Sequence, residues 1–140
     1  MNVQQQIQAA KAQLQQGHAQ VASQALEKLV AAQPAHAEGW NLLALAYAKT
    51  NRLPAAREAI AAALKLAPTA GMYLTAANIE QDLGALDNAI AMAQGAVRLQ
   101  PEYPEAFNNL GILLSDAGRI GEALNAFSDA VRLRPAYARA

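Results

Sequence analysis

The stretch FNNLGILLSDAGRIGEALNAFSDAVRLRP, residues 107–135, shows most clearly a pattern that runs through the whole chain. Its landmarks return at steps of 34, 33 and 34 residues. Three series keep these steps: prolines (Pro34, Pro68, Pro101, Pro135), alanines (Ala22, Ala56, Ala89, Ala123) and turn residues (Gly17, Asn51, Gly84, Gly118). Recurrence at a fixed period indicates a chain built from stacked supersecondary units.

Each unit is predicted to hold two helices joined by a turn. In the second unit, large or apolar residues recur at i, i+3, i+4 and i+7: Trp40, Leu43, Ala44 and Tyr47. This spacing indicates an amphipathic helix. A turn residue follows, and Gly and Asn are the types that tolerate the positive φ that closes a helix. A second helix, such as 86–99, then runs up to a proline that cannot continue it. The alanine series predicts close helix crossings, where a larger side chain would overpack the contact.

Two of the units carry a family resemblance. The second reads Trp40-x-x-Leu43-Ala44-x-x-Tyr47, then Ala56-x-x-x-Ile60, then Pro68. The fourth is similar at Phe107, Leu110, Gly111, Leu114, Ala123, Phe127, Ala130 and Pro135. These residues resemble the tetratricopeptide repeat signature, W-x-x-L-G-x-x-Y, A-x-x-x-F and P over about 34 residues. The resemblance implies an all-α fold, a right-handed α-solenoid of tandem helix-turn-helix repeats. We expect one array over residues 1–140, with repeats at 3–36, 37–69, 70–103 and 104–137.

The composition argues against several classes of partner. Eleven Lys and Arg balance 11 Asp and Glu over 140 residues, so no basic excess marks a nucleic-acid or anionic membrane surface. There is no cysteine, which excludes disulfides and thiolate metal sites. No apolar run approaches the roughly 20 residues of a membrane span. We therefore expect neither nucleic acid nor a membrane as a partner.

No set of residues suggests catalysis or a bound cofactor. His18 and His36 fall in different turns, without acidic or cysteine partners at ligand spacing, so no metal site is predicted. The sequence holds no glycine-rich phosphate loop. Ser115 and Ser128 have no base that register places beside them. We expect no cofactor and no enzymatic activity. The expected location is cytoplasmic by default, with the periplasm left open should a signal segment have been removed.

By resemblance to the family, the first helices of the repeats line a groove that holds a peptide or a partner helix. Register places the following residues on it: Lys11, Asn41, Leu45, Lys49, Leu74, Thr75, Asn78, Asp82, Asn108, Asn109, Ile112 and Asp116. Asn side chains can pair with both donors and acceptors of an extended backbone. We expect peptide binding through such bonds, with a mild preference for basic residues near Asp82 and Asp116. The alternative is that these residues are only solvated helix faces.

Two subtypes of the family can be compared residue by residue. Chaperone-binding repeats hold a C-terminal carboxylate with a clamp of Lys, Asn and Arg. In the first three repeats the corresponding sites are Ile7, Lys11, Leu42, Gly71 and Thr75. The next register gives Asn41, Leu45, Thr75, Glu105 and Asn109. Neither set has the paired cations that a carboxylate needs, so this role is not expected. The segment EAFNNLG resembles repeats of O-linked sugar transferases, but among the equivalent sites only Asn109 fits their asparagine ladder.

Two functions remain open. The first is a protein-interaction scaffold. The second is an N-terminal targeting module of a larger enzyme, of glycosyltransferase or sulfotransferase type, with its catalytic domain outside this segment. The chain stops three residues into a fifth unit, so we expect a fragment of a longer protein or a C-terminal face covered by another subunit. That face would present Leu124, Phe127 and Val131, and a homo-oligomer formed through it is a further expectation.

Overall fold

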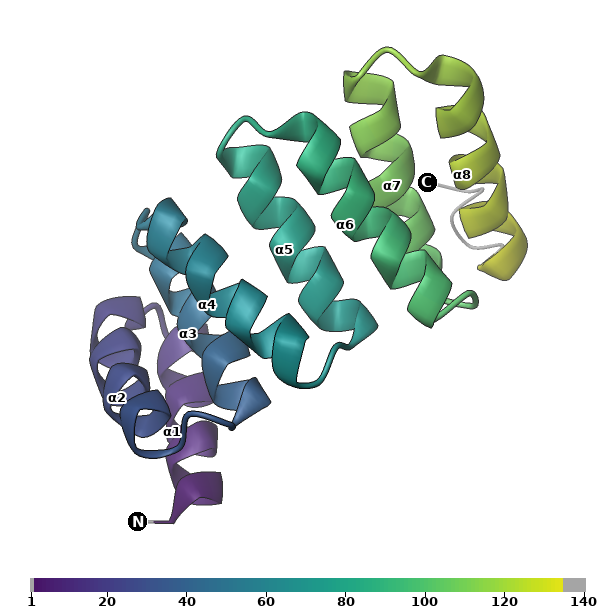
Figure 1. The fold of residues 1–140 in the computed structure, drawn as a ribbon. Helices are drawn as coiled ribbons and strands as arrows, with labels where there is room; N and C mark the ends of the chain where they lie inside the picture. Colours follow the sequence, from purple (N-terminus) through teal and green to yellow (C-terminus); the bar gives the residue numbers. More distant parts are fainter. Residues whose placement is uncertain (1, 135–140) are drawn as a thin grey trace. The chain divides into compact units, whose positions relative to one another are not determined.

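The computed structural model describes residues 2–134, and over this range it has eight α-helices and no strand (Figure 1). The chain divides into unit 1, Met1–Pro68, and unit 2, Thr69–Ala140. Unit 1 holds α1 (Val3–Gln15), α2 (Ala19–Ala32), α3 (Ala37–Lys49) and α4 (Leu53–Leu66). Unit 2 holds α5 (Ala70–Asp82), α6 (Leu86–Leu99), α7 (Pro104–Asp116) and α8 (Ile120–Leu133). The expectations about Pro135 and an unfinished fifth repeat lie outside the described residues.

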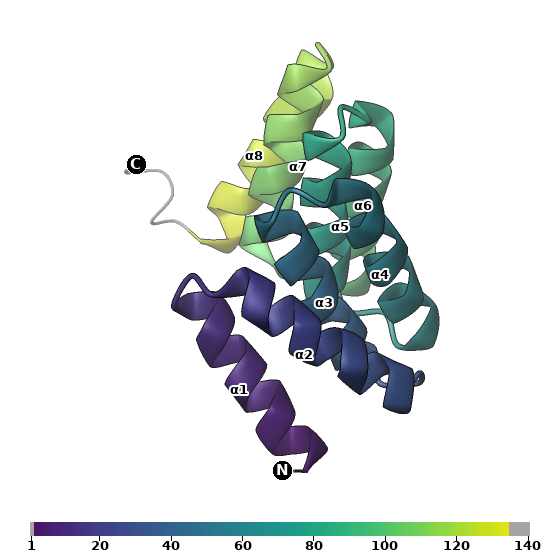
Figure 2. The same cartoon turned by 90° about the vertical axis from the view of Figure 1, so that its left-hand side faces the viewer.

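Each unit consists of two helical hairpins that pack on one another. In unit 1, α2 contacts both α1 and α3, α3 contacts α4, and α1 also touches α3. Figure 2 shows α1 and α2 side by side, joined by a short turn. Unit 2 has the same arrangement, with contacts between α5 and α6, α6 and α7, α7 and α8, and α5 and α7. The first helices of the two hairpins are therefore neighbours within each unit, and their outer sides form one face.

The turn inside each hairpin is closed by a residue with positive φ, as the sequence predicts. The φ values are 83° at Gly17, 59° at Asn51, 81° at Gly84 and 78° at Gly118. The residue after each turn residue donates its N–H to a carbonyl five positions back, as in His18 to Gln13 at 2.8 Å. This pairing is the Schellman motif, which satisfies carbonyls that the helix end would leave unpaired. The same 2.8 Å bond recurs in the other three hairpins.

The connectors between hairpins follow the proline series. Helices α2, α4 and α6 each end two residues before a proline, at Pro34, Pro68 and Pro101. Proline cannot donate the next helical hydrogen bond, and it disfavours helical geometry in the residue before it. In unit 1 the connector is also fixed by Trp40, whose Nε1 donates to the Pro34 carbonyl at 2.8 Å. Trp40 is half-buried, and its hydrogen bond holds the connector against the start of α3.

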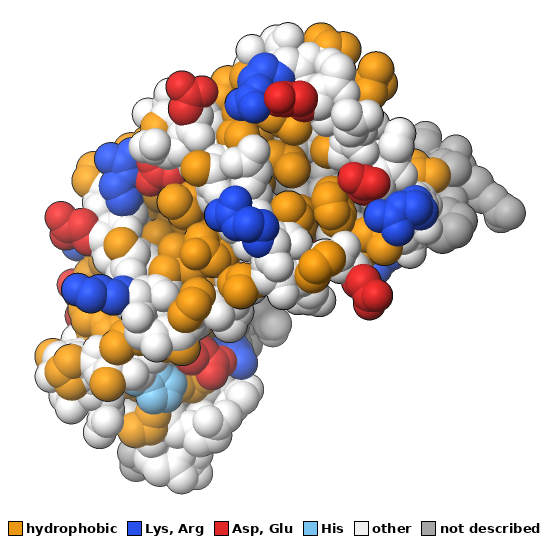
Figure 3. Space-filling model, turned by 45° about the vertical axis from the view of Figure 1, so that its right-hand side comes forward, with side chains coloured by type: hydrophobic (Ala, Val, Ile, Leu, Met, Phe, Trp, Pro, Cys, Tyr) orange, Lys and Arg blue, Asp and Glu red, His pale blue; other side chains and the backbone are white. Residues whose placement is uncertain are grey.

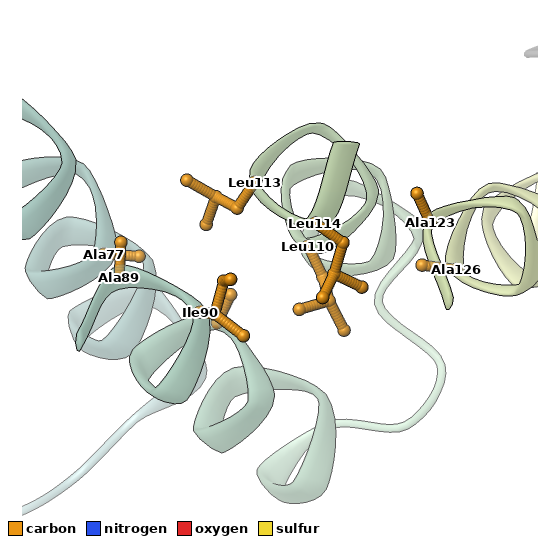
Figure 4. Packing of buried hydrophobic residues seen from close by; sticks show 9 residues of the cluster. Ala77, Ala89, Ile90, Leu110, Leu113, Leu114, Ala123 and Ala126 are labelled. Atoms are coloured by element: carbon orange, nitrogen blue, oxygen red, sulfur yellow. The ribbon is translucent and has the colours of Figure 1, made fainter. Parts of the chain in front are cut away.

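The alanine series lies in the first turn of each second helix and is buried, as close packing of the two helices requires. Ala22, Ala56 and Ala89 are fully buried, and Ala123 is 2% exposed. In unit 2, Ala89 and Ala123 belong to one core cluster with larger residues of α6 and α7 (Figure 4). The members labelled there are Ala77, Ala89, Ile90, Leu110, Leu113, Leu114, Ala123 and Ala126. Small residues let the two helices of a hairpin approach closely, so the larger side chains can fill the space between hairpins.

Gly111 has a packing role of its own in α7. A Cβ atom built at this position would lie 2.7 Å from Cε1 of the Phe127 ring on α8. Carbon atoms in contact prefer a separation of about 3.5–4.0 Å, so only the absence of a side chain lets Phe127 pack there. The close approach predicted at Gly111 is confirmed. The positions that correspond to Gly111 and Phe127 in the second repeat are Ala44 and Ile60, which are both buried.

Candidate functional site

The twelve predicted groove residues all lie on the first helices of the hairpins, α1, α3, α5 and α7. Their exposure varies. Lys49, Asn78, Asp82, Ile112 and Asp116 are exposed, whereas Lys11, Asn41, Leu45, Thr75, Asn108 and Asn109 are half-buried. Eleven of the twelve side chains are therefore at least partly open to solvent, and their surroundings differ between the two units.

Leu74 differs from the other predicted groove residues because it is buried. Its side chain is 8% exposed and packs in a core cluster of unit 2 with Ala70, Ala96 and Ala106. In register it corresponds to Asn41 and Asn108, which are half-buried amides. Burying the isobutyl group of a leucine is favourable, whereas burying an amide without a hydrogen-bond partner is unfavourable. The position is therefore buried where it holds Leu and partly open where it holds Asn.

Two further polar residues of the set have a reduced capacity to hydrogen-bond a ligand. The Thr75 hydroxyl donates to the Gly71 carbonyl at 3.1 Å, one turn earlier in α5. The Asn41 Oδ1 atom is buried and has no hydrogen-bond partner among the described residues. The Thr75 hydroxyl therefore has no hydrogen left to donate to a ligand, although its oxygen can still accept, and the Asn41 oxygen is closed to a ligand. Asn78, Asn108 and Asn109 are the amides of unit 2 that remain open enough to pair with one.

In unit 1 the structure brings three of the predicted residues together around one pocket. Lys11 of α1 and Leu45 and Lys49 of α3 line a cavity of about 250 Å³. The other lining residues are Leu14, Gln15 and Leu42. Leu14 is 8% exposed and Leu42 5% exposed, so they form the buried floor, and the lysines stand at the rim. The floor leucines were missing from the predicted set, because register assigns them to the inner side of the helices.

The two lysines of this α1–α3 pocket have different electrostatic environments. Lys11 Nζ lies 2.7 Å from Glu38 Oε1, in an ion pair between α1 and α3 whose side chains are 42% and 44% exposed. Lys49 forms no ion pair with any residue of the described range. Lys49 lies one turn beyond the clamp positions, so a comparison of those positions alone misses it. One cation at this pocket is therefore unmatched.

The chain has zero net charge, but its two units carry opposite formal charges. Unit 1 has six Lys and Arg and three Asp and Glu, a formal charge of +3. Unit 2 has five Lys and Arg and eight Asp and Glu, a formal charge of −3. All four lysines of the chain, Lys11, Lys28, Lys49 and Lys65, lie in unit 1. On the face drawn in Figure 3, cations and acids stand between patches of hydrophobic side chains.

One shifted pKa occurs away from the first-helix faces. Burial raises the pKa of Tyr47 above its ordinary value, and so do the hydrogen bond to Glu27 and the charge of Glu27. The Tyr47 hydroxyl donates to Glu27 Oε2 at 2.9 Å, and the Arg52 guanidinium lies 4.4 Å from the centre of the Tyr47 ring. These contacts join α2 to α3 and fix the start of α4. They stabilise unit 1 and activate no nucleophile.

The described part of the chain has neither a metal site nor a membrane span. Between residues 2 and 134, no three His, Asp or Glu side chains gather closely enough to hold a metal ion. Within the same range, no helix is both long enough and apolar enough to cross a bilayer. His36 has a structural task, since its Nδ1 accepts the Gly39 N–H at 3.0 Å and caps α3.

The comparison with known families decides the classification. A family model described as tetratricopeptide repeat matches residues 7–71 and 74–140, nearly the whole chain. The chain belongs to the tetratricopeptide repeat family. The resemblance found in the sequence is thus confirmed, and so is the predicted all-α solenoid class. The tetratricopeptide repeat fold is a protein–protein interaction scaffold, and its members are generally not enzymes.

This tetratricopeptide repeat chain is similar to three known proteins in sequence or in fold. Small glutamine-rich tetratricopeptide repeat-containing protein 2 of Mycosarcoma maydis is 35% identical over 83 residues, which is 58% of this chain and 23% of that protein. This chain therefore corresponds to less than a quarter of that relative. The crystal structure of MamA is 23% identical with a TM-score of 0.89, covering 99% of this chain and 82% of that one. YrrB, described as a TPR protein with an unusual peptide-binding site, is 19% identical with a TM-score of 0.79, covering 93% and 68%.

Proposed function

We propose that this chain is a binding scaffold, without catalytic activity of its own, whose first helices hold peptide segments or a partner helix. The observation that carries the proposal is the α1–α3 pocket, which is lined by the predicted groove residues Lys11, Leu45 and Lys49. An apolar hollow with a few polar groups at its rim is the common form of a recognition site. YrrB, which shares the fold, is described as having a peptide-binding site.

The first-helix face of unit 2 has a different chemistry. Asp82 at the end of α5 and Asp116 at the end of α7 are exposed, and Ile112 is 43% exposed between acidic and amide neighbours. Opposite charges attract across an interface and like charges repel. This face therefore favours basic residues, and its Asn side chains offer hydrogen bonds to an extended backbone. The formal charge of −3 on unit 2 acts in the same direction.

Selection from a random peptide library on the immobilised chain tests the proposal. The affinity of each selected peptide is then measured by fluorescence anisotropy for the wild type and for Leu45→Asp, which puts a charge against the floor of the α1–α3 pocket. Losing the burial of one apolar side chain is expected to weaken binding about tenfold or more. Leu66→Asp is the matched control, because Leu66 is a 43% exposed leucine on the second helix α4.

The outcome depends on where the selected peptides bind. Peptides of the pocket class lose affinity in Leu45→Asp and stay within about twofold of the wild type in Leu66→Asp. Peptides of the unit 2 class respond instead to the pair Asn78→Ala and Asn109→Ala. If every selected peptide is indifferent to all of these first-helix changes, the first helices do not form the binding surface and the proposal fails.

Self-association through α8 is a second part of the proposal. Ile120, Leu124 and Val131 of this helix are 53%, 62% and 37% exposed. Ile90 of α6, which corresponds to Leu124, is buried where α7 covers it. Exposed apolar residues grouped on one helix are typical of a docking surface. A second subunit covering this face would bury them as α7 buries the matching side of α6.

A further inference from the structure

We propose that the α1–α3 pocket recognises an apolar side chain that has a carboxylate next to it in the same peptide segment. The inference rests on the proposed function and adds the chemistry of the ligand. It concerns unit 1 alone, and it needs no residue beyond the six that line the pocket.

The size and floor of the pocket select the apolar part of the ligand. Its volume of about 250 Å³ is below the roughly 300–1,000 Å³ of small-molecule sites, and it suits one inserted side chain. Leu14, Leu42 and Leu45 present only hydrocarbon to an occupant. A polar side chain placed against them would lose its water and gain no hydrogen bond. A branched or unbranched aliphatic residue is therefore the fitting occupant.

The rim selects the carboxylate. Lys49 stands on the last turn of α3 and has no acidic partner among the described residues. A lysine lays its methylene stem along apolar surface and keeps its ammonium group in water. A carboxylate beside the inserted side chain meets this ammonium group, while a cation at the same place would be repelled. Lys49 also complements the dipole at the end of α3, and a bound anion leaves that contact in place.

Lys11 can join the recognition because its present partner is easily exchanged. The ion pair with Glu38 is 2.7 Å long, but both side chains are more than two-fifths exposed. Such pairs contribute little to stability, so Lys11 can share a second carboxylate or move from Glu38 to it. The positive charge of unit 1 as a whole raises the local concentration of acidic segments around this pocket.

Titration of the intact chain with three synthetic peptides tests the inference. One peptide carries alternating Leu and Glu within a Gly and Ser background; in the second every Glu is Gln, and in the third every Leu is Ser. Chemical shifts of the backbone amides are followed up to millimolar peptide. The Leu/Glu peptide is expected to perturb α1 and α3, and to bind about threefold to fivefold tighter than the Leu/Gln peptide at about 50 mM salt. This advantage shrinks at about 500 mM salt.

Variants of single lysines test whether the peptide carboxylate binds at the rim of this pocket. Lys49→Met keeps the apolar stem and removes the charge, so it is expected to reduce the preference for Glu over Gln by about half or more, while Lys11 retains the rest. Lys65→Met is the matched control, because Lys65 lies on the last turn of the second helix α4, and it should leave the preference unchanged. Equal loss in both variants would show a general effect of charge and overturn the inference.

Failure of the inference can be told apart from failure of the proposed function. If the Leu/Gln peptide binds α1 and α3 as tightly as the Leu/Glu peptide, the pocket is a peptide site that ignores charge. The proposed function then stands and the inference falls. If the Ser/Glu peptide binds best, the apolar floor is not used and the inference also falls. If library peptides bind through the first helices but the Leu/Glu peptide does not, the pocket does not select an acidic apolar segment, and only the inference falls.

Discussion

Replacing Gly111 by alanine places a methyl group against the ring of Phe127. The added Cβ would lie 2.7–2.9 Å from three atoms of the ring, so the ring or the helix has to shift. Overpacking of this kind typically costs about 1–3 kcal/mol. Alanine in a helix interior is in turn favoured over glycine by about 1 kcal/mol. The net expectation for Gly111→Ala is a loss of about 0–2 kcal/mol in the free energy of unfolding.

Gly121→Ala separates these two effects. Gly121 lies in α8, and a Cβ atom there meets nothing within 4 Å. Gly121 is the second residue of α8, so this variant gains part of the helix propensity without a clash, and its stability should rise by less than about 1 kcal/mol. The difference between the two variants, about 1–3 kcal/mol, isolates the contact with Phe127. Urea unfolding followed by far-ultraviolet circular dichroism measures both, and an unchanged m-value is needed for the comparison.

A double variant checks the same contact from the other side. Gly111→Ala together with Phe127→Ile gives α7 and α8 the pair that unit 1 has at Ala44 and Ile60. Phe127→Ile alone leaves a gap over Gly111, so the two changes should compensate each other with a coupling of about 1 kcal/mol or more. If Gly111→Ala stabilises the chain as much as Gly121→Ala does, Phe127 does not press on Gly111 and the packing argument is refuted.

Three further changes have defined outcomes. Asn51→Ala should cost about 1 kcal/mol in urea unfolding because φ is 59° at this residue, whereas Asn51→Gly should stay within about 0.5 kcal/mol of the wild type. Tyr47→Phe removes the hydrogen bond to Glu27 and should cost about 1 kcal/mol at neutral pH. Because the pKa of Tyr47 is raised in the folded state, the wild type should also lose stability above about pH 10, where the unfolded tyrosine ionises first, and Tyr47→Phe should lack this part of the loss. In sedimentation velocity the apparent mass of the wild type should rise with concentration, and Leu124→Glu should abolish the rise while Leu66→Glu does not.

The features that depend on backbone chemistry could be predicted from the sequence. Only a few residue types accept positive φ, so Gly17 and Asn51 mark their turns by residue type alone. A proline near each helix end and a small residue at each crossing are equally local constraints. These residues recur at the same step in all four repeats. Each repeat alone is a weak signal, but four repeats in phase predict the fold strongly.

The candidate site was harder to predict because it depends on neighbouring side chains. Counting along a helix assigns a face but does not say whether that face is covered. Leu74 follows the same register as Asn41, yet its apolar side chain is buried in the core of unit 2. The α1–α3 pocket needs Leu14 and Leu42 from the inner side of two helices, and no single repeat contains both. The pairing of Lys11 with Glu38 depends likewise on contact between two repeats.

The distribution of lysines has a practical consequence for experiments on this protein. Every side-chain amine of the sequence lies between residues 11 and 65. Amine-directed dyes, crosslinkers and acylating reagents will therefore modify side chains of the first two hairpins and leave those of the last two untouched. Acylation at Lys49 would remove the charge at the rim of the α1–α3 pocket, so a coupling chemistry that immobilises the chain through its amines would alter this pocket.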